Sequence, residues 1–331
     1  MTPAALAEGV LAGDQRALAR AITVVENREP GARELLSRLH PHRGGAAVVG
    51  VTGSPGTGKS TLVDRLAKAY RAKDLTVGVV AVDPASPFSG GAVLGDRIRM
   101  TGGDMDVFVR SMSARGSLGG LSAATADAVA VLDAFGKDRI VVETVGAGQN
   151  EVDVVRTADT VVVLVTPQSG DDVQMLKAGI LEIGDVFVVN KADLAGAGRT
   201  VRDLEEMVHL AGGRVGSHRD GGEGAGWTPP VVETVATEGE GIDDLVAALD
   251  DHRALLEDSG RLDRRARERD AETLRRLLRE DVGRLVEAEL SARGGLEAAV
   301  DRIEAGETTP YDLAAELVAP FERLERELAG E

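Results

Sequence analysis

The chain has 331 residues, with 38 Lys and Arg, 55 Asp and Glu and no Cys, and its formal net charge is −17. The negative charge argues against a general nucleic-acid or anionic-membrane binder, because such proteins present a positive surface. The lack of Cys excludes a disulfide scaffold, a Cys-ligated metal site and a thiol nucleophile, and five scattered His residues do not suggest a His-rich metal site.

Residues 1–43 are predicted to form helices, because apolar residues recur at helical spacing between breaks at Gly13, Pro30 and Pro41. The first ten residues contain Glu8 and lack the basic region of an export signal. No apolar run approaches the roughly 18–20 residues that a membrane span requires. We therefore expect a cytoplasmic protein that binds neither membranes nor nucleic acids.

From residue 46 onward, short Val-rich runs alternate with amphipathic stretches of helical length. Continuous apolar runs are typical of parallel strands that are buried on both faces. Their alternation with helices predicts an α/β fold with a doubly wound, mostly parallel sheet. The predicted strands are 46–51, 76–82, 106–110, 139–143, 160–166, 185–190 and 231–235.

Residues 212–230 are rich in Gly and are predicted to form a loop, whereas the chain from 241 onward is predicted to be helical. The apolar stripe of this last part is too narrow to form a core alone, so it should pack on the main domain or on a second copy. The sequence predicts three parts: an N-terminal helical extension (1–43), a P-loop nucleotide-binding domain (44–258) and a C-terminal helical arm (259–331).

The strongest motif lies between a predicted strand and a predicted helix over 62–70. It fits G-x-x-x-x-G-K-S/T, in which glycines let backbone N–H groups surround phosphate oxygens and the helix N-terminus adds its dipole. We expect Lys59 to reach the β and γ phosphates and the Ser60 hydroxyl to ligate Mg²⁺. The predicted phosphate-binding residues are Gly53, Ser54, Pro55, Gly56, Thr57, Gly58, Lys59, Ser60 and Thr61.

A second motif, Asn190-Lys191-Ala192-Asp193, directly follows another predicted strand. In N-K-x-D, the Asp carboxylate accepts hydrogen bonds from the N1–H and the 2-amino group of guanine. Adenine lacks this pair of donors, so ATP would leave a buried carboxylate unpaired, at a cost of roughly 1–3 kcal/mol. The two motifs together predict a site for GTP and GDP.

Acidic residues stand near the ends of two predicted strands. Asp83 follows one strand, Glu143 ends another and is followed by Gly146, and Asp96 lies in a Gly-rich segment. A carboxylate at such a strand end can hold Mg²⁺, while the N–H of the glycine meets the γ-phosphate. Glu143 is the firmer prediction, because Asp83 and Asp96 taken singly are also ordinary turn residues.

The sequence gives a less specific signal for the residues that would orient water and stabilise the transition state. Gln149, three residues beyond Gly146, is a candidate to orient the attacking water. Arg99, Arg110 and Arg115 are candidates to neutralise charge that develops on the phosphates. Each of these arginines is equally well explained as an ion-pair partner.

Over nearly its whole length, the chain resembles the methylmalonyl-CoA mutase-associated GTPases, the MeaB/MMAA (ArgK-type) group of P-loop G proteins. The segment 82–100 is long and unusual, which makes the resemblance specific. The matching segments are GDQRALARAITVVE (13–26), VGVTGSPGTGKSTLVDRL (49–66), VDPASPFSGGAVLGDRIRM (82–100), RSMSARGSLGGLS (110–122), VETVGAGQNEVDV (142–154), GDDVQMLKAGILEIGDVFVVNKADL (170–194) and GWTPPVVETVATEGEGIDDL (226–245).

The resemblance implies roles for residues that the motifs left open. The segments 84–101 and 143–155 would be the two switches of a GTPase, and 167–180 would be a further switch that signals to a mutase. The C-terminal arm would contribute to a homodimer. The residues implied are Asp83, Asp96 and Glu143 for Mg²⁺, Asp171, Gln174 and Lys177 for coupling to the mutase, and the backbone of Val235 and Ala236 for contact with the base oxygen, with Thr237 as a further nucleotide-binding residue.

The function implied by the resemblance is that of a GTP-hydrolysing chaperone. It would gate cobalamin delivery to, and protect, an adenosylcobalamin-dependent methylmalonyl-CoA mutase or a related acyl-CoA mutase. A metal-insertion GTPase of the urease or hydrogenase type is an alternative, disfavoured because the chain has no Cys and no dense His tract. Further alternatives are a transport-system protein kinase, for which no protein-substrate site is recognisable, and a scaffold that binds GTP without hydrolysing it.

Overall fold

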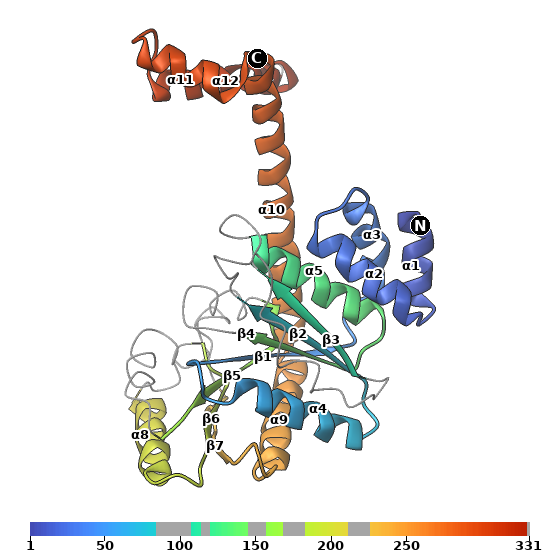
Figure 1. The fold of residues 1–331 in the computed structure, drawn as a ribbon, viewed down its shortest axis with the longest axis vertical. Helices are drawn as coiled ribbons and strands as arrows, with labels where there is room; N and C mark the ends of the chain where they lie inside the picture. Colours follow the sequence, from blue (N-terminus) through green and yellow to red (C-terminus); the bar gives the residue numbers. More distant parts are fainter. Residues whose placement is uncertain (84–106, 114–119, 145–156, 168–182, 211–225, 330–331) are drawn as a thin grey trace. The chain divides into compact units, whose positions relative to one another are not determined.

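The computed structural model describes residues 1–83, 107–113, 120–144, 157–167, 183–210 and 226–329. The chain divides into two compact units, Met1–Ala266 and Arg267–Glu331. The first is built around a β-sheet, and the second is helical (Figure 1). Within the described ranges, no helix is both long enough and apolar enough to cross a bilayer.

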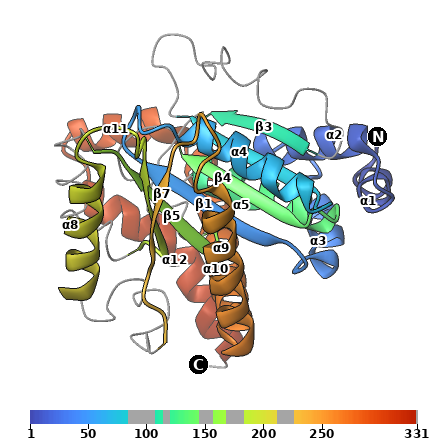
Figure 2. The ribbon, with the colours of Figure 1, turned by 90° about the horizontal axis from the view of Figure 1, so that it is seen from below.

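Within the described residues, the sheet of the first unit has seven strands in the order β3-β2-β4-β1-β5-β6-β7. Every neighbouring pair is parallel, which confirms the predicted α/β fold with a parallel sheet. Figure 2 shows β3 at one edge. The strands are β1 (Ala47–Gly53), β2 (Val77–Asp83), β3 (Val107–Ser113), β4 (Arg139–Thr144), β5 (Thr160–Val165), β6 (Val186–Asn190) and β7 (Val231–Thr234).

The strand β5 shows why the apolar runs are continuous. All of its residues are buried. Val161 and Val163 pack into the core on one face of the sheet, whereas Val162 and Leu164 pack into the core on the other face. Since successive side chains of a strand point to opposite faces, a central strand covered on both sides needs an apolar residue at each position.

Helices cover both faces of the sheet. The helices α5 and α8 contribute to the core on one face, and the N-terminal helices α1, α2 and α3 join the same core. These N-terminal helices gather beside α5 (Figures 1 and 2). The helices α4 and α9 pack on the opposite face. The bounds are α1 (Pro3–Leu11), α2 (Gln15–Glu26), α3 (Ala32–Leu39), α4 (Lys59–Ala72), α5 (Gly120–Ala134), α8 (Ala197–Leu210) and α9 (Ile242–Asp258).

The strand order determines where a ligand can bind. The chain leaves β1 for β2 and β3, returns to β4 beside β1, and then crosses to β5 on the other side of β1. In open α/β sheets, ligands bind at the carboxyl ends of the strands where the order reverses. The loop between β1 and α4 lies at such a point.

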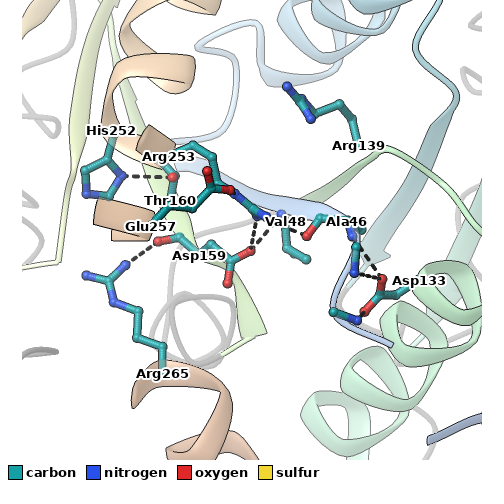
Figure 3. Close-up of polar contacts among 12 residues, drawn as sticks. Ala46, Val48, Asp133, Arg139, Asp159, Thr160, His252, Arg253, Glu257 and Arg265 are labelled. Atoms are coloured by element: carbon teal, nitrogen blue, oxygen red, sulfur yellow. Dashed lines mark hydrogen bonds and ion pairs between the residues drawn. The ribbon is translucent and has the colours of Figure 1, made fainter. Parts of the chain in front are cut away.

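The amino ends of β1 and β5 are held by two buried or partly buried aspartates (Figure 3). Asp159 accepts the Val48 N–H at 3.0 Å and pairs with Arg253 at 3.4 Å, while its carbonyl accepts from Arg265 at the start of α10. Asp133 accepts three consecutive backbone N–H groups of residues 44–46. These contacts fix the start of the strand that leads to the predicted phosphate loop.

The second unit contains most of α10 (Arg261–Ala292), together with α11 (Gly295–Glu304) and α12 (Pro310–Ala329). Its small core consists of Ala299, Leu313 and Leu317, with Val286 and Leu290 of α10 packed against it. Another stripe of α10 is exposed. It comprises Leu274, Leu278, Val282 and Leu285, which are 55–58% exposed.

Candidate functional site

The end of β1 and the loop that joins it to α4 each require glycine at one position for steric reasons. A Cβ on Gly53 would lie 2.3 Å from the carbonyl oxygen of Leu164 on the neighbouring strand. A Cβ on Gly58 would lie 2.5 Å from Nδ2 of Asn190, and the φ of Gly58 is +93°. Both distances are too short for any side chain, so the loop packs directly against β5 and the end of β6.

Lys59 is the first residue of α4, and it is only 6% exposed. Its Nζ donates to the carbonyl oxygens of Gly53 at 2.5 Å and Ser54 at 2.8 Å. The Thr57 hydroxyl donates to the same Ser54 carbonyl at 2.9 Å. The ammonium is thus held at the loop, where a helix N-terminus and backbone N–H groups favour anions.

Ser60 and Glu143 meet at the same end of the sheet. Glu143 lies on β4 in register with Val51 of β1, and its side chain is fully buried. The Ser60 hydroxyl donates to Oε1 of Glu143 at 2.5 Å. A hydroxyl and a carboxylate are the hard oxygen ligands that Mg²⁺ prefers, so the chemistry of this pair fits the predicted magnesium site.

Asn190 joins three segments of the site. It is 2% exposed, and its Nδ2 donates to the carbonyl of Thr57 at 2.8 Å. Its Oδ1 accepts from the Thr234 hydroxyl at 3.0 Å and from the Ala236 N–H at 3.1 Å. The first residue of N-K-x-D therefore ties the phosphate loop to the segment that follows β7.

The second residue of N-K-x-D, Lys191, also contacts the phosphate loop. Lys191 has a left-handed backbone with φ of 59°, and its Nζ donates to the Gly56 carbonyl at 2.9 Å. A pocket opens beside it. The pocket is lined by Gly58, Thr61, Asn190, Lys191, Asp193, Val235, Ala236 and Thr237. The structure thus brings the start of α4, the N-K-x-D motif and the segment after β7 around one hollow.

The comparison with known families identifies the chain. The model of the family described as "Methylmalonyl Co-A mutase-associated GTPase MeaB" matches residues 18–291. The chain belongs to the MeaB family. It is a GTPase and binds guanine nucleotide, in agreement with the two motifs.

Individual relatives support this membership of the MeaB family. A Pyrococcus abyssi protein that carries a GTPase name is 50% identical over 93% of this chain and 94% of its own. The fused isobutyryl-CoA mutase of Cupriavidus metallidurans is 38% identical over 60% of this chain, but only 19% of its own. The crystal structure of a LAO/AO transport system kinase matches with a TM-score of 0.69 and 26% identity, covering 97% of both chains.

Some predicted residues of this MeaB family member lie outside the part of the chain that the structure describes. They are Asp96, Arg99, Arg115, Gly146, Gln149, Asp171, Gln174 and Lys177, together with most of the three predicted switch segments. The backbone of Asp83 ends β2, where it pairs with Ser113 of β3. The roles predicted for these residues in Mg²⁺ binding, hydrolysis and coupling to a mutase therefore stay predictions.

Arg110 is explained by the ion-pair alternative. It lies on β3, and its guanidinium pairs with the carboxylate of Glu26 on α2. This contact joins the N-terminal helices to the edge strand. A signal for it could not be read from the sequence, because 84 residues separate the two partners.

The loop that follows β7 directs two of its backbone N–H groups to acceptors within the protein. The Val235 N–H donates to the carbonyl of Glu240 at 3.1 Å, and the Ala236 N–H donates to Asn190. Both N–H groups expected to contact the base oxygen therefore have protein acceptors. Arg65 of α4 also contacts this loop, and no sequence signal indicates this role, because the partners are more than 170 residues away.

Proposed function

We propose that this GTPase is a chaperone of an adenosylcobalamin-dependent acyl-CoA mutase, of the methylmalonyl-CoA mutase type or a related one. It would use GTP to gate cobalamin delivery to the mutase and to protect it. The observation that carries this proposal is the match to a family described as mutase-associated. The fused isobutyryl-CoA mutase supports it, because that protein holds a segment similar to this chain.

The arrangement of the site supports separate roles for its residues in GTP binding and hydrolysis. The N–H groups of the phosphate loop and Lys59 would bind the phosphates, and the carboxylate of Asp193 would bind the guanine. Ser60 and Glu143, with Asp83 and Asp96 as further candidates, would hold Mg²⁺. When bound, this ion would neutralise charge on the β and γ phosphates. Gln149 would orient the attacking water, and Arg99 would neutralise charge in the transition state.

We also propose that the protein is a homodimer formed through its C-terminal arm. The exposed stripe of α10, Leu274, Leu278, Val282 and Leu285, supports this proposal. These residues recur every three or four positions, as in helices that pair along one face. Val282→Lys should shift the protein toward monomer in analytical ultracentrifugation, whereas an unchanged sedimentation coefficient would count against this interface.

The mutase proposal can be tested by measuring GTP hydrolysis alone and with a purified adenosylcobalamin-dependent mutase. We expect the mutase to change the rate, and we expect Lys177→Ala to remove that change while leaving basal hydrolysis nearly intact. Lys68→Ala is the matched control, because Lys68 is an exposed residue of α4 whose ion pair with Asp64 lies within the same helix. A mutase that neither binds nor alters hydrolysis in any nucleotide state would contradict the proposal.

A further inference from the structure

The loop after β7, residues 235–240, is a tight turn that closes on itself. The N–H groups of Glu238 and Gly239 both donate to the carbonyl of Val235 at 2.9 Å, and Val235 pairs with Glu240 in an antiparallel bridge. We call residues 235–240 the base loop, because three of them line the pocket beside N-K-x-D. Its own hydrogen bonds leave the carbonyls of Ala236 and Thr237 to be satisfied by another element.

Arg65 of α4 satisfies these carbonyls. Its Nε donates to the Ala236 carbonyl at 3.0 Å, and its Nη2 donates to the Thr237 carbonyl. Arg65 lies one helical turn after Thr61, which lines the pocket, so both residues are on the same face of α4. The planar guanidinium offers donors in a fixed fork, which suits two adjacent carbonyl groups better than an ammonium does.

These two hydrogen bonds contribute to the orientation of the base loop, together with the Val235–Glu240 bridge and the bond from the Ala236 N–H to Asn190. A peptide unit is planar and here trans, so fixing a carbonyl also fixes the direction of the N–H on the same unit. The carbonyl of Ala236 shares its peptide unit with the N–H of Thr237. Arg65 therefore sets the direction of a backbone donor in the loop that lines the pocket.

We infer that Arg65 is a positioning residue for guanine recognition. It links α4, the helix that carries Lys59 and Ser60, to the base loop, and through the Ala236 carbonyl it fixes the direction of the Thr237 N–H, which would donate to an acceptor on the base. The 6-position of guanine carries an oxygen, which accepts, whereas that of adenine carries an amino group, which donates. The fixed loop thus favours guanine over adenine. This inference rests on the proposed use of the pocket for the base.

The inference is tested by titration calorimetry of GDP and of ADP, both with Mg²⁺, on four proteins. They are the wild type, Arg65→Met, Arg65→Lys and Arg71→Met. Arg71 is the matched control, because it also donates to a backbone carbonyl from α4, that of Leu75 at 3.1 Å. We expect Arg65→Met to weaken GDP binding about tenfold, which corresponds to about 1.4 kcal/mol, and to leave ADP binding unchanged.

Two further measurements separate positioning from a general structural role. Arg65→Lys should restore part of the GDP affinity, because an ammonium can reach one carbonyl. In GTP hydrolysis, Arg65→Met should raise KM and leave kcat at saturating GTP unchanged. Arg71→Met should behave as the wild type in all three assays.

Several results would overturn the inference. An equal loss of GDP and ADP affinity in Arg65→Met and Arg65→Lys would show that Arg65 acts on the phosphate loop or on folding. A change in GDP affinity below about twofold would show that the base loop does not need it. If the wild type itself binds GDP and ADP equally, the pocket does not read the base, and the assignment of the pocket fails independently of Arg65.

Discussion

Asn190 offers a test of how the two halves of the site are connected. It makes three buried hydrogen bonds, one to the phosphate loop at Thr57 and two toward the base loop at Thr234 and Ala236. A buried hydrogen bond contributes about 1 kcal/mol net, so Asn190→Ala should remove about 3 kcal/mol of stabilisation from folding and nucleotide binding together. If this loss appeared only in nucleotide binding, it would correspond to roughly a 150-fold change in affinity.

Asn190→Asp separates the contribution of the hydrogen bond to Thr57 from that of the hydrogen bonds to Thr234 and Ala236. Its carboxylate still accepts from the Thr234 hydroxyl and the Ala236 N–H, but it presents an oxygen in place of the amide donor to the Thr57 carbonyl. An unpaired buried carbonyl costs about 1–3 kcal/mol. We expect Asn190→Asp to weaken GDP and ADP by similar factors, because only the link to the phosphate loop is broken. Asn190→Ala should weaken GDP more than ADP.

The assays are titration calorimetry with both nucleotides and urea unfolding followed by tryptophan fluorescence. Trp227 is the one Trp of the chain, and its indole N–H donates to the Asp185 carbonyl at 2.8 Å, so its emission should report on folding of the region around β6. The reasoning is refuted if Asn190→Asp loses the preference for GDP as fully as Asn190→Ala does. In that case the charge or the base contact of residue 190, and not its link to the phosphate loop, would determine selectivity.

The remaining predictions concern the phosphate loop and the packing of the sheet. Lys59→Ala should weaken the binding of GTP and GDP at least 100-fold, or about 2.8 kcal/mol, as titration calorimetry would measure; equal affinity would contradict its role in binding the phosphates. Asp159→Asn should lower the free energy of unfolding by about 1.5–3 kcal/mol, because Arg253 loses a charged partner; urea unfolding measures this. Asp138→Asn should cost about 1 kcal/mol at neutral pH, and the difference from the wild type should shrink as the pH falls below about 4.

The sign of the Asp138 effect follows from its surroundings. Partial burial would raise the pKa of Asp138, but hydrogen bonds from the N–H and hydroxyl of Thr76, both at 2.7 Å, and the charge of Arg139 hold the pKa below its usual value. A lowered pKa stabilises the fold above the ordinary carboxyl pKa of about 3.9, and this contribution is lost as the pH falls through the folded value. Urea unfolding between pH 3 and 7 would show no such convergence if the carboxylate contributed nothing.

The strands and the phosphate loop could be predicted because their signals are local. The apolar runs of β1, β5 and β6 reflect burial on both faces, and G-x-x-x-x-G-K-S/T places its glycines where Gly53 and Gly58 leave no room for a side chain. Each of these features needs only a few consecutive residues. The predicted ends of these strands accordingly lie within a few residues of the observed ends.

The contacts that hold the site together could not be predicted in the same way. Arg65 meets Ala236 across 171 residues, and Asn190 meets Thr57 across 133 residues. Arg and Asn are common in helices and at strand ends, so neither residue type in itself indicates a partner. Such contacts depend on the order of the strands, which puts β6 and β7 on the same side of β1 as β5.

The base loop shows how such long-range contacts affect the prediction of which N–H groups contact the base. From the sequence, the N–H groups of Val235 and Ala236 were the expected donors to the base oxygen, yet they donate to Glu240 and Asn190. An oxygen of guanine could bind the Ala236 N–H only by sharing it with Asn190. The N–H of Thr237, whose direction Arg65 sets through the Ala236 carbonyl, requires no such sharing with Asn190. Recognition of guanine would then depend on α4 as well as on N-K-x-D, which is why Arg65→Met should distinguish GDP from ADP.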